Sequence, residues 1–307
     1  MSIIQQVSGY FLIFILLFSV GCKKEIIVAE EEQILVEVVN DTSVINGNIR
    51  PPDSTIADLT IETYVNKVYI SLLGREPENT ELSAGVTVLK KNNVSIANRE
   101  ELVDEVLNKD GYTQRLFESN MAILLENTDT SDVSEQIAIL NFLLTDSTYA
   151  PIFDQINYEI GRLTALKSTP KELKTGTIDI VEVHRRMVNN SFYDDINMGT
   201  ENFVVSMFQN FLNRYPTANE LEEGTQIVDG LGGILFFTQG NSKDDFIAII
   251  LDTDNYYESQ VRDLYLRYLF REPTSVEVTE AAVSYKKNGD YPETQKAILV
   301  SNEYVGL

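Results

Sequence analysis

The side chains that most often carry out chemistry in proteins are scarce in this chain. Its 307 residues include one cysteine, Cys22, and one histidine, His184. So few ligands cannot form a zinc site with several Cys or His residues, and a single cysteine cannot form an internal disulfide. His184 lies in the segment VEVHRRM, and no Gly-x-Ser-x-Gly or comparable nucleophile motif accompanies it. We therefore predict no catalytic histidine, no metal and no cofactor, and we expect His184 to be a surface residue on a salt-bridged helix.

Carboxylates are abundant instead. The chain has 47 Asp and Glu residues against 24 Lys and Arg residues, with a formal net charge of -23. A glycosidase requires a carboxylate pair, but among so many acidic residues a suitable spacing arises by chance. Two aspartate pairs, Asp129 with Asp132 and Asp252 with Asp254, suggest calcium, yet neither continues with the glycine and glutamate of an EF-hand loop. We interpret both pairs as helix caps or loops, and we expect no nucleic-acid partner because the charge would repel a phosphate backbone.

An apolar segment near the N-terminus precedes the only cysteine. Residues 10–21 read YFLIFILLFSVG, carry no charge and are too few to cross about 30 Å of hydrocarbon, which is typical of a secretory signal. The small residues before Cys22 resemble the lipobox of bacterial lipoproteins. The resemblance implies that residues 1–21 are removed and that Cys22 carries lipid, which anchors the chain to a membrane of the cell envelope, where we expect the outer membrane. The alternative is a short N-terminal membrane anchor with an incidental cysteine.

Beyond a stretch typical of a tether, three copies of one helical pattern follow. Each copy has apolar residues at i, i+3, i+4, i+7 and i+8, the spacing of one helix face. The fifteen positions are Val65, Val68, Tyr69, Leu72 and Leu73; Val204, Met207, Phe208, Phe211 and Leu212; and Val261, Leu264, Tyr265, Tyr268 and Leu269.

Each apolar face ends in the motif Arg-x-Pro-x-x-x-Glu-apolar. The proline ends one helix, and Thr with Glu three residues later predicts a capping box that opens the next in two of the copies. The first copy has Glu78 in place of Thr and a weaker predicted start. Because the arginine lies at a helix C-terminus within reach of the glutamate, we assign the motif a structural role. Its residues are Arg75, Pro77 and Glu81; Arg214, Pro216 and Glu220; and Arg271, Pro273 and Glu277.

The copies also end alike, in Leu-x-x-x-x-Tyr. We expect the tyrosine of each closure to dock the next segment. The closures are Leu107 to Tyr112, Leu251 to Tyr256 and Leu299 to Tyr304, with related ones from Leu144 to Tyr149 and from Val188 to Tyr193. The last two indicate either a degenerate copy or a helical insert between the first and second copies.

These motifs together resemble a known repeat. An apolar helix, then LLGREP or YLFREP, then a second helix and a final S-x-E-Y are similar to a helical repeat of uncharacterised secreted bacterial proteins and to the related phycobilisome linker domain; residues 261–304 match best. The resemblance implies a small all-helical module that docks other proteins and has no catalytic residues. It does not imply pigment binding, because phycobilisome linkers tend to be basic.

The second copy contains a glycine-rich insertion, residues 230–241. The distance from the repeat arginine to the closing leucine is 37 residues in this copy, against 32 and 28 in the others. Because the other copies form the module without it, we predict that the insertion binds a partner and that its glycines let it project. The predicted contact residues are Leu231, Ile234, Leu235, Phe236 and Phe237. The alternative is that residues 234–237 belong to the core.

The sequence as a whole predicts an all-α array of short helical repeat modules. The expected parts are a signal peptide (1–21), a lipidated N-terminus and tether (22–58), repeat 1 (59–120), an insert or degenerate repeat (121–200), repeat 2 (201–260) and repeat 3 (261–307). We expect a lipid-anchored envelope protein, not an enzyme, that acts as a scaffold and contacts envelope proteins or polymers. The alternatives are a glycan or cell-wall hydrolase with a carboxylate pair and an accessory subunit of a secretion or surface complex.

Overall fold

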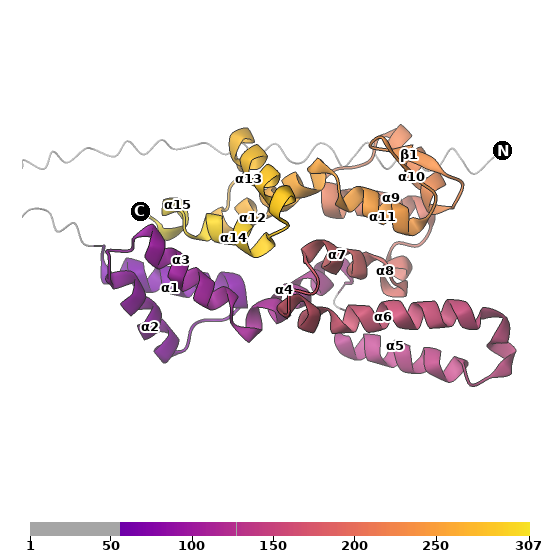
Figure 1. Cartoon of the computed structure of the whole chain (residues 1–307), viewed down its shortest axis with the longest axis horizontal. Coiled ribbons are helices and arrows are strands. Elements are labelled where there is room, and N and C mark those ends of the chain that lie inside the picture. Colours follow the sequence, from indigo (N-terminus) through magenta and orange to yellow (C-terminus); the bar gives the residue numbers. More distant parts are fainter. Residues whose placement is uncertain (1–55, 127) are drawn as a thin grey trace, which may run out of the picture. The chain divides into compact units, whose positions relative to one another are not determined.

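The structure is a computed structural model that describes residues 56–126 and 128–307 (Figure 1). The described residues form fifteen α-helices, one 3-10 helix and a two-stranded hairpin, which confirms the predicted all-α fold class. One compact unit spans Asp53–Leu307. The predicted signal peptide and Cys22 lie outside the described residues.

The first repeat contains three helices and leads into a fourth. Its first helix ends at Gly74, whose φ of 69° is the left-handed conformation that closes many helices. The elements are α1 (Asp58–Leu73), α2 (Asn79–Lys90), α3 (Ile96–Leu107) and α4 (Asp110–Leu124).

The second and third repeats share a helix. The long helix α12 is both the last helix of the second repeat and the first of the third, so the expected bound between residues 260 and 261 falls inside it. The bound between residues 120 and 121 likewise falls inside α4. The elements are α9 (Thr200–Leu212), α10 (Ala218–Val228), β1 (Gly233–Leu235), β2 (Thr238–Gly240), α11 (Lys243–Leu251), α12 (Asp254–Leu269), α13 (Ser275–Asn288), α14 (Tyr291–Leu299) and α15 (Asn302–Val305).

The segment between α4 and α9 shares one helix contact with the repeats and adds a helix pair. α7 packs on α4 as α3 packs on α1, α11 on α9 and α14 on α12. α7 and α14 also begin alike, with the N-cap residues Asp179 and Asp290. α5 and α6, which pack against each other, stand where the other repeats have one helix. The elements are α5 (Thr130–Leu143), the 3-10 helix η2 (Ser147–Ile152), α6 (Phe153–Lys174), α7 (Ile180–Val188) and α8 (Ser191–Ile196).

The core is built from the predicted apolar faces. Thirteen of the fifteen positions are buried, and Tyr265 and Leu269 are partly buried against the same core. Apolar residues of the third helices, such as Val103, Val183 and Ile250, complete it. The 3.6-residue period therefore identified the helix faces that the fold buries.

The closing tyrosines form hydrogen bonds with other helices of the chain. Tyr112 on α4 donates to Gln295 Oε1 on α14 at 2.5 Å, and the hydroxyl of Tyr193 on α8 accepts from Asn210 on α9. Tyr256 contacts His184 on α7, and the Tyr304 hydroxyl on α15 lies 2.7 Å from that of Ser71 on α1. Tyr149 differs: it lies in η2 and is exposed, because its closure falls in the insertion.

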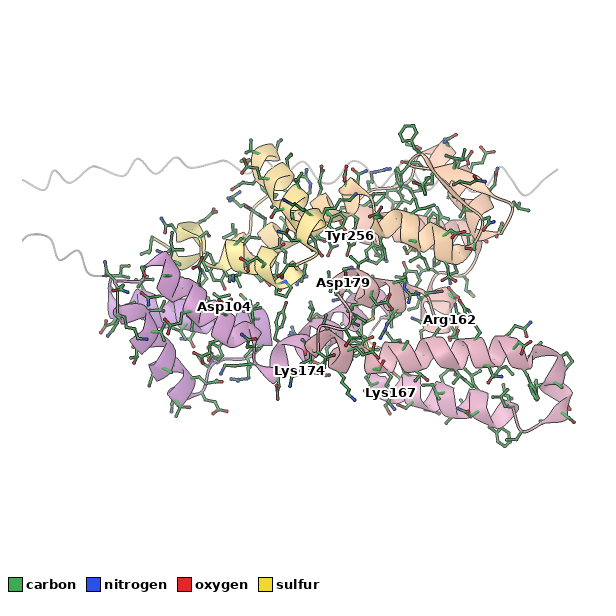
Figure 2. The ribbon with its side chains drawn as sticks, viewed as in Figure 1. Asp104, Arg162, Lys167, Lys174, Asp179 and Tyr256 are labelled. Atoms are coloured by element: carbon green, nitrogen blue, oxygen red, sulfur yellow. The ribbon has the colours of Figure 1, made fainter. Side chains whose placement is uncertain are left out.

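The first and last repeats meet along a seam. α1 contacts α15 and α3 contacts α14. Tyr64 on α1 donates to the carbonyl of Leu299 at 3.1 Å, and Arg99 on α3 donates to the carbonyl of Val300 at 2.8 Å. Asp104 on α3, labelled in Figure 2, pairs with Lys296 on α14 at 3.0 Å. The two ends of the compact unit are thus held together by buried hydrogen bonds and an ion pair.

Candidate functional site

The three Arg-x-Pro turns have the same geometry. In each turn both terminal guanidinium nitrogens donate to one glutamate at distances between 2.6 and 3.0 Å, and the glutamate also accepts the backbone N–H of the N-cap residue. The pairs are Arg75 with Glu81, Arg214 with Glu220 and Arg271 with Glu277. Capping boxes open α10 and α13 as predicted, and α2 begins with one as well.

These turns have little capacity to bind a ligand. The guanidinium groups hold the pKa of Glu81, Glu220 and Glu277 at about 2, and the N-cap N–H groups add to the effect. In the third turn Arg271 also donates to Glu303 at the C-terminal end of the fold. Each charged group of the turns already has a partner within the protein. The turns connect helix ends, in keeping with a structural role.

His184 is buried, so our expectation of a surface histidine was wrong. Its side chain is 4% exposed, with Nδ1 2.8 Å from the Tyr256 hydroxyl and Nε2 3.0 Å from Asn120 Oδ1. Burial lowers the pKa of His184 to about 3. The ring is therefore neutral: Nδ1 accepts from Tyr256 and Nε2 donates to Asn120. Figure 2 labels Tyr256 near Asp179, the residue before α7. The flanking arginines suggested a polar helix, but the face of α7 that carries His184 packs inside the protein.

The two aspartate pairs cap helices, as interpreted. Asp129 accepts the backbone N–H of Asp132, and Asp132 accepts that of Asp129. Asp252 follows α11, and Asp254 in the first turn of α12 pairs with Lys286 at 3.0 Å. Within residues 56–126 and 128–307 no group of three or more His, Cys, Asp or Glu side chains could hold a metal ion.

The glycine-rich insertion forms a hairpin, the only strands among the described residues. β1 and β2 pair antiparallel, with Gly233 opposite Gly240 and Leu235 opposite Thr238. The two-residue loop is Phe236 and Phe237, whose φ angles are 50° and 63°. Positive φ at both positions is the type I′ turn that matches the twist of a hairpin. The sequence predicted a projecting insertion here and did not anticipate a strand pair.

We had expected the glycines to let the segment project, but Gly233 and Gly240 in the strands instead allow close packing. A Cβ on Gly233 would lie 2.8 Å from the carbonyl oxygen of Glu223 on α10. A Cβ on Gly240 would lie 2.9 Å from Ile227 and 3.0 Å from Asp245 Cβ. The Glu223 carboxylate also accepts the backbone N–H of Ile234 at 2.6 Å. The hairpin is therefore held against α10 and α11.

Alternation along the strands divides the five predicted contact residues. Leu235 is 2% exposed and belongs to the core, so its assignment to a binding surface was wrong. Phe236 is partly buried, with its ring centroid 5.9 Å from that of Phe208. Leu231, Ile234 and Phe237 are 77%, 61% and fully exposed. We call these three residues the hairpin face.

Two phenylalanines combine exposure with unfavourable backbone geometry. A type I′ turn favours Asn-Gly, and a bulky residue at positive φ is an outlier. Phe237 has this conformation without burying its ring. Phe270, which ends α12 with φ of 55°, is 87% exposed. The sequence already held the signal for Phe270, because Gly74 and Asn213 occupy the same place before the arginine in the other copies.

A cavity of about 680 Å³ lies beside the hairpin. It is bounded by the hairpin, by the junction of α11 with α12 and by α13, and its lining includes Phe236, Thr238, Ile249, Asp252, Asn255 and Lys286. Lys286 pairs with Asp254 at 3.0 Å and donates to the carbonyl of Asp252 at 2.7 Å, so its charge is already engaged. The cavity adds a concave surface next to Phe236 and Thr238 of the hairpin.

Among the described residues no helix is long and apolar enough to cross a membrane. Comparisons of the chain with protein-family models, with curated proteins and with solved structures find no match. The hairpin face and the cavity beside the hairpin are therefore candidate sites on physical grounds alone.

Proposed function

We propose that this chain is a lipid-anchored helical scaffold of the bacterial envelope that binds a partner protein through the hairpin face. The observation that carries the proposal is Phe237, a fully exposed aromatic ring on a turn whose backbone disfavours it. Leu231 and Ile234, on the same glycine-rich segment, are further exposed apolar side chains.

Neither the backbone preference of phenylalanine nor packing in the core explains why a phenylalanine stands at position 237. Residues in sparsely populated backbone regions cost about 1–3 kcal/mol each and cluster at functional sites. Removing an exposed ring from water would recover free energy only in a complex. Because Leu235 and the close-packed glycines fix the hairpin to α10 and α11, little conformational entropy is lost when a partner binds there.

Cross-linking in cells tests the contact. A photo-reactive residue at position 231, on the hairpin face, is expected to give a discrete protein adduct in the full-length chain. The matched control is the same residue at position 96, because Ile96 is 60% exposed on an ordinary helix surface. Phe237→Gly is expected to abolish the adduct at 231 without lowering stability. Adducts to lipid alone, or equal protein adducts at both positions, would contradict the proposal.

The lipid anchor is proposed from the resemblance of the Cys22 segment to a lipobox. Metabolic labelling with palmitate is expected to mark the protein, and Cys22→Ser is expected to abolish both the label and membrane association. A serine variant that stays membrane-bound after a high-salt wash would favour a short membrane-embedded anchor instead.

The two alternative functions, an accessory subunit and a glycan hydrolase, place different requirements on the structure. An accessory subunit of a secretion or surface complex would use the same contact, so the identity of the cross-linked partner separates it from a general scaffold. A glycan hydrolase requires an acid with a raised pKa near a second carboxylate. Burial raises the pKa of Asp263, but this carboxyl accepts from Asn213 at 3.0 Å and none of the described cavities includes it. No specific observation therefore favours the hydrolase.

A further inference from the structure

A second cavity lies where α1, α4, α12 and α14 meet. Its volume is about 340 Å³, within the range of small-molecule sites. The polar side chains of its wall include Tyr112, Arg115, Glu118, Arg267, Tyr268 and Gln295. Three of these form a chain of hydrogen bonds: Tyr112 donates to Gln295 at 2.5 Å, and Gln295 donates to Tyr268 at 2.6 Å. The Tyr268 hydroxyl keeps its own proton to donate.

The two arginines of this wall stand apart from the others. Of the ten described arginines, seven pair with a carboxylate. An eighth, Arg99, is buried and donates to the carbonyls of Val94 and Val300 and to Asn302. The remaining two are Arg115 and Arg267, and both line this cavity. In a protein with a net charge of -23, two arginines without an ion pair in one cavity are unexpected.

Both side chains are oriented by neighbours that do not neutralise them. The Arg115 side chain lies against Gly74, where an added Cβ would be 2.7 Å from Nε, so a larger residue there would displace it. Arg267 lies beside the hydroxyl groups of Tyr268 and Tyr291. The nearby carboxylates are Glu118, which lines the cavity, and Asp263, one turn before Arg267; neither forms an ion pair with these arginines.

The equivalent place in the other half of the fold is filled. When Tyr112 is aligned with Tyr256, Ser259 takes the place of Arg115. When Tyr64 is aligned with Phe203, Phe211 takes the place of Leu72. Ser259 and Phe211 are both buried. His184 takes the place of Gln295, and its ring centroid lies 5.2 Å from that of Phe211. The fold can therefore close this junction with aromatic packing, and the open, arginine-lined junction is not a requirement of the repeat.

We propose that this cavity binds a small oxyanion, a carboxylate or a phosphate group, between Arg115 and Arg267. Guanidinium groups bind both kinds of anion through paired hydrogen bonds, and the Tyr268 hydroxyl supplies a third donor. The ligand is a small molecule with at least one such group, and it binds independently of the partner at the hairpin face.

Calorimetric titration of the purified full-length protein tests this site. The probes are inorganic phosphate and, separately, succinate, each in chloride buffer at constant ionic strength. We expect saturable binding of at least one probe, which also identifies the class of anion. Arg115→Gln and Arg267→Gln are each expected to weaken it at least tenfold, and Arg115→Lys less, because it keeps the charge but loses the planar fork.

The matched control is Arg262→Gln, which removes an arginine of the same helix α12 that points to Glu272 and does not line the cavity. It is expected to bind like the unchanged protein. Absence of saturable binding with both probes, or equal binding by Arg115→Gln, would overturn the proposal. An unfolded Arg115→Gln variant would overturn it too, since the site requires this arginine to be dispensable for the fold.

Discussion

His184 on α7 and Gln295 on α14 occupy equivalent places. Each lies five residues after the N-cap aspartate of its helix, Asp179 or Asp290. Each side chain contacts a closing tyrosine from the other half of the chain. Tyr256 on α12 contacts His184 at 2.8 Å, and Tyr112 on α4 contacts Gln295 at 2.5 Å. The two halves thus exchange the same contact in both directions. An imidazole and an amide each serve because both combine a donor with an acceptor.

Substitution of His184 by glutamine is therefore expected to preserve the fold at pH 7 and to remove one source of acid sensitivity. The pKa of His184 is about 3 in the folded state and 6.5 in the unfolded state. As the pH falls below 6.5, the histidine therefore takes up a proton in the unfolded chain and stays neutral in the folded chain. Stability is lost in that direction, by about 1.4 kcal/mol per pH unit. Urea unfolding at pH 7 and pH 5 should show a loss of about 2 kcal/mol in the unchanged protein that His184→Gln lacks.

The window between pH 7 and pH 5 avoids the titration of the glutamates in the Arg-x-Pro turns. The glutamates of the Arg-x-Pro turns have pKa values of about 2, so their contribution is complete above about 4.5 and falls only below it. Equal losses in both proteins between pH 7 and pH 5 would show that His184 is not the titrating group.

The cap of α10 gives a second prediction. The Thr217 hydroxyl accepts the backbone N–H of Glu220 at 3.3 Å, and Thr217→Ala is expected to cost about 1 kcal/mol of unfolding free energy. Thr217→Ser keeps the acceptor and serves as the control. Chemical denaturation of both variants measures the difference; a serine variant as unstable as the alanine variant would mean that methyl packing, and not the cap, matters here.

Close helix contacts give a third prediction. Gly224 on α10 meets Val204 and Phe246, with an added Cβ 2.9 Å from the Phe246 ring, and Gly85 is crowded in the same way by Val65 and Leu102. We expect Gly224→Ala to destabilise the protein by about 1–3 kcal/mol. Gly161 on α6 has no atom within 4 Å of an added Cβ, so Gly161→Ala should raise stability by about 0.5–1 kcal/mol. Thermal unfolding that moved in the same direction for both would contradict the contact geometry.

The end of α12 gives a fourth prediction. Phe270 adopts the left-handed conformation that Gly74 and Asn213 adopt at the equivalent helix ends. Because Phe270 is exposed and gains little from packing, Phe270→Gly is expected to stabilise the protein by about 1 kcal/mol. Phe270→Leu, a bulky residue with the same backbone penalty, is the control. A glycine variant no more stable than the leucine variant would show that the ring is held by the fold.

Local signals in the sequence predicted the helices and their ends well. The apolar faces of α1, α9 and α12 follow from spacing alone, and the capping boxes at Thr217 and Thr274 need only four consecutive residues. His184 could not be placed in the same way. Its burial depends on Asn120 and Tyr256, which lie 64 and 72 residues away, whereas its neighbours Arg185 and Arg186 suggested a surface helix.

The hairpin shows another limit of local reasoning. An apolar run such as residues 234–237 has no period of its own, so the sequence could not tell which side chains face inward. The structure resolves this through the turn at Phe236 and Phe237, which puts Leu235 in the core and leaves Ile234 exposed. The cavity with Arg115 and Arg267 was also beyond local reasoning, because these residues come from two helices of different repeats.

The seam between the first and last repeats has a consequence for how the chain folds. Its buried contacts join residues far apart in the sequence, as with Tyr64 and Leu299, which are 235 positions apart. Closing so long a loop costs entropy before any seam contact is made, so we expect the α1–α15 and α3–α14 contacts to form late. In a newly made chain Tyr64 and Arg99 of the first repeat would lack their seam partners until the last helices are synthesised, and during that interval this flank is open to other unfolded chains.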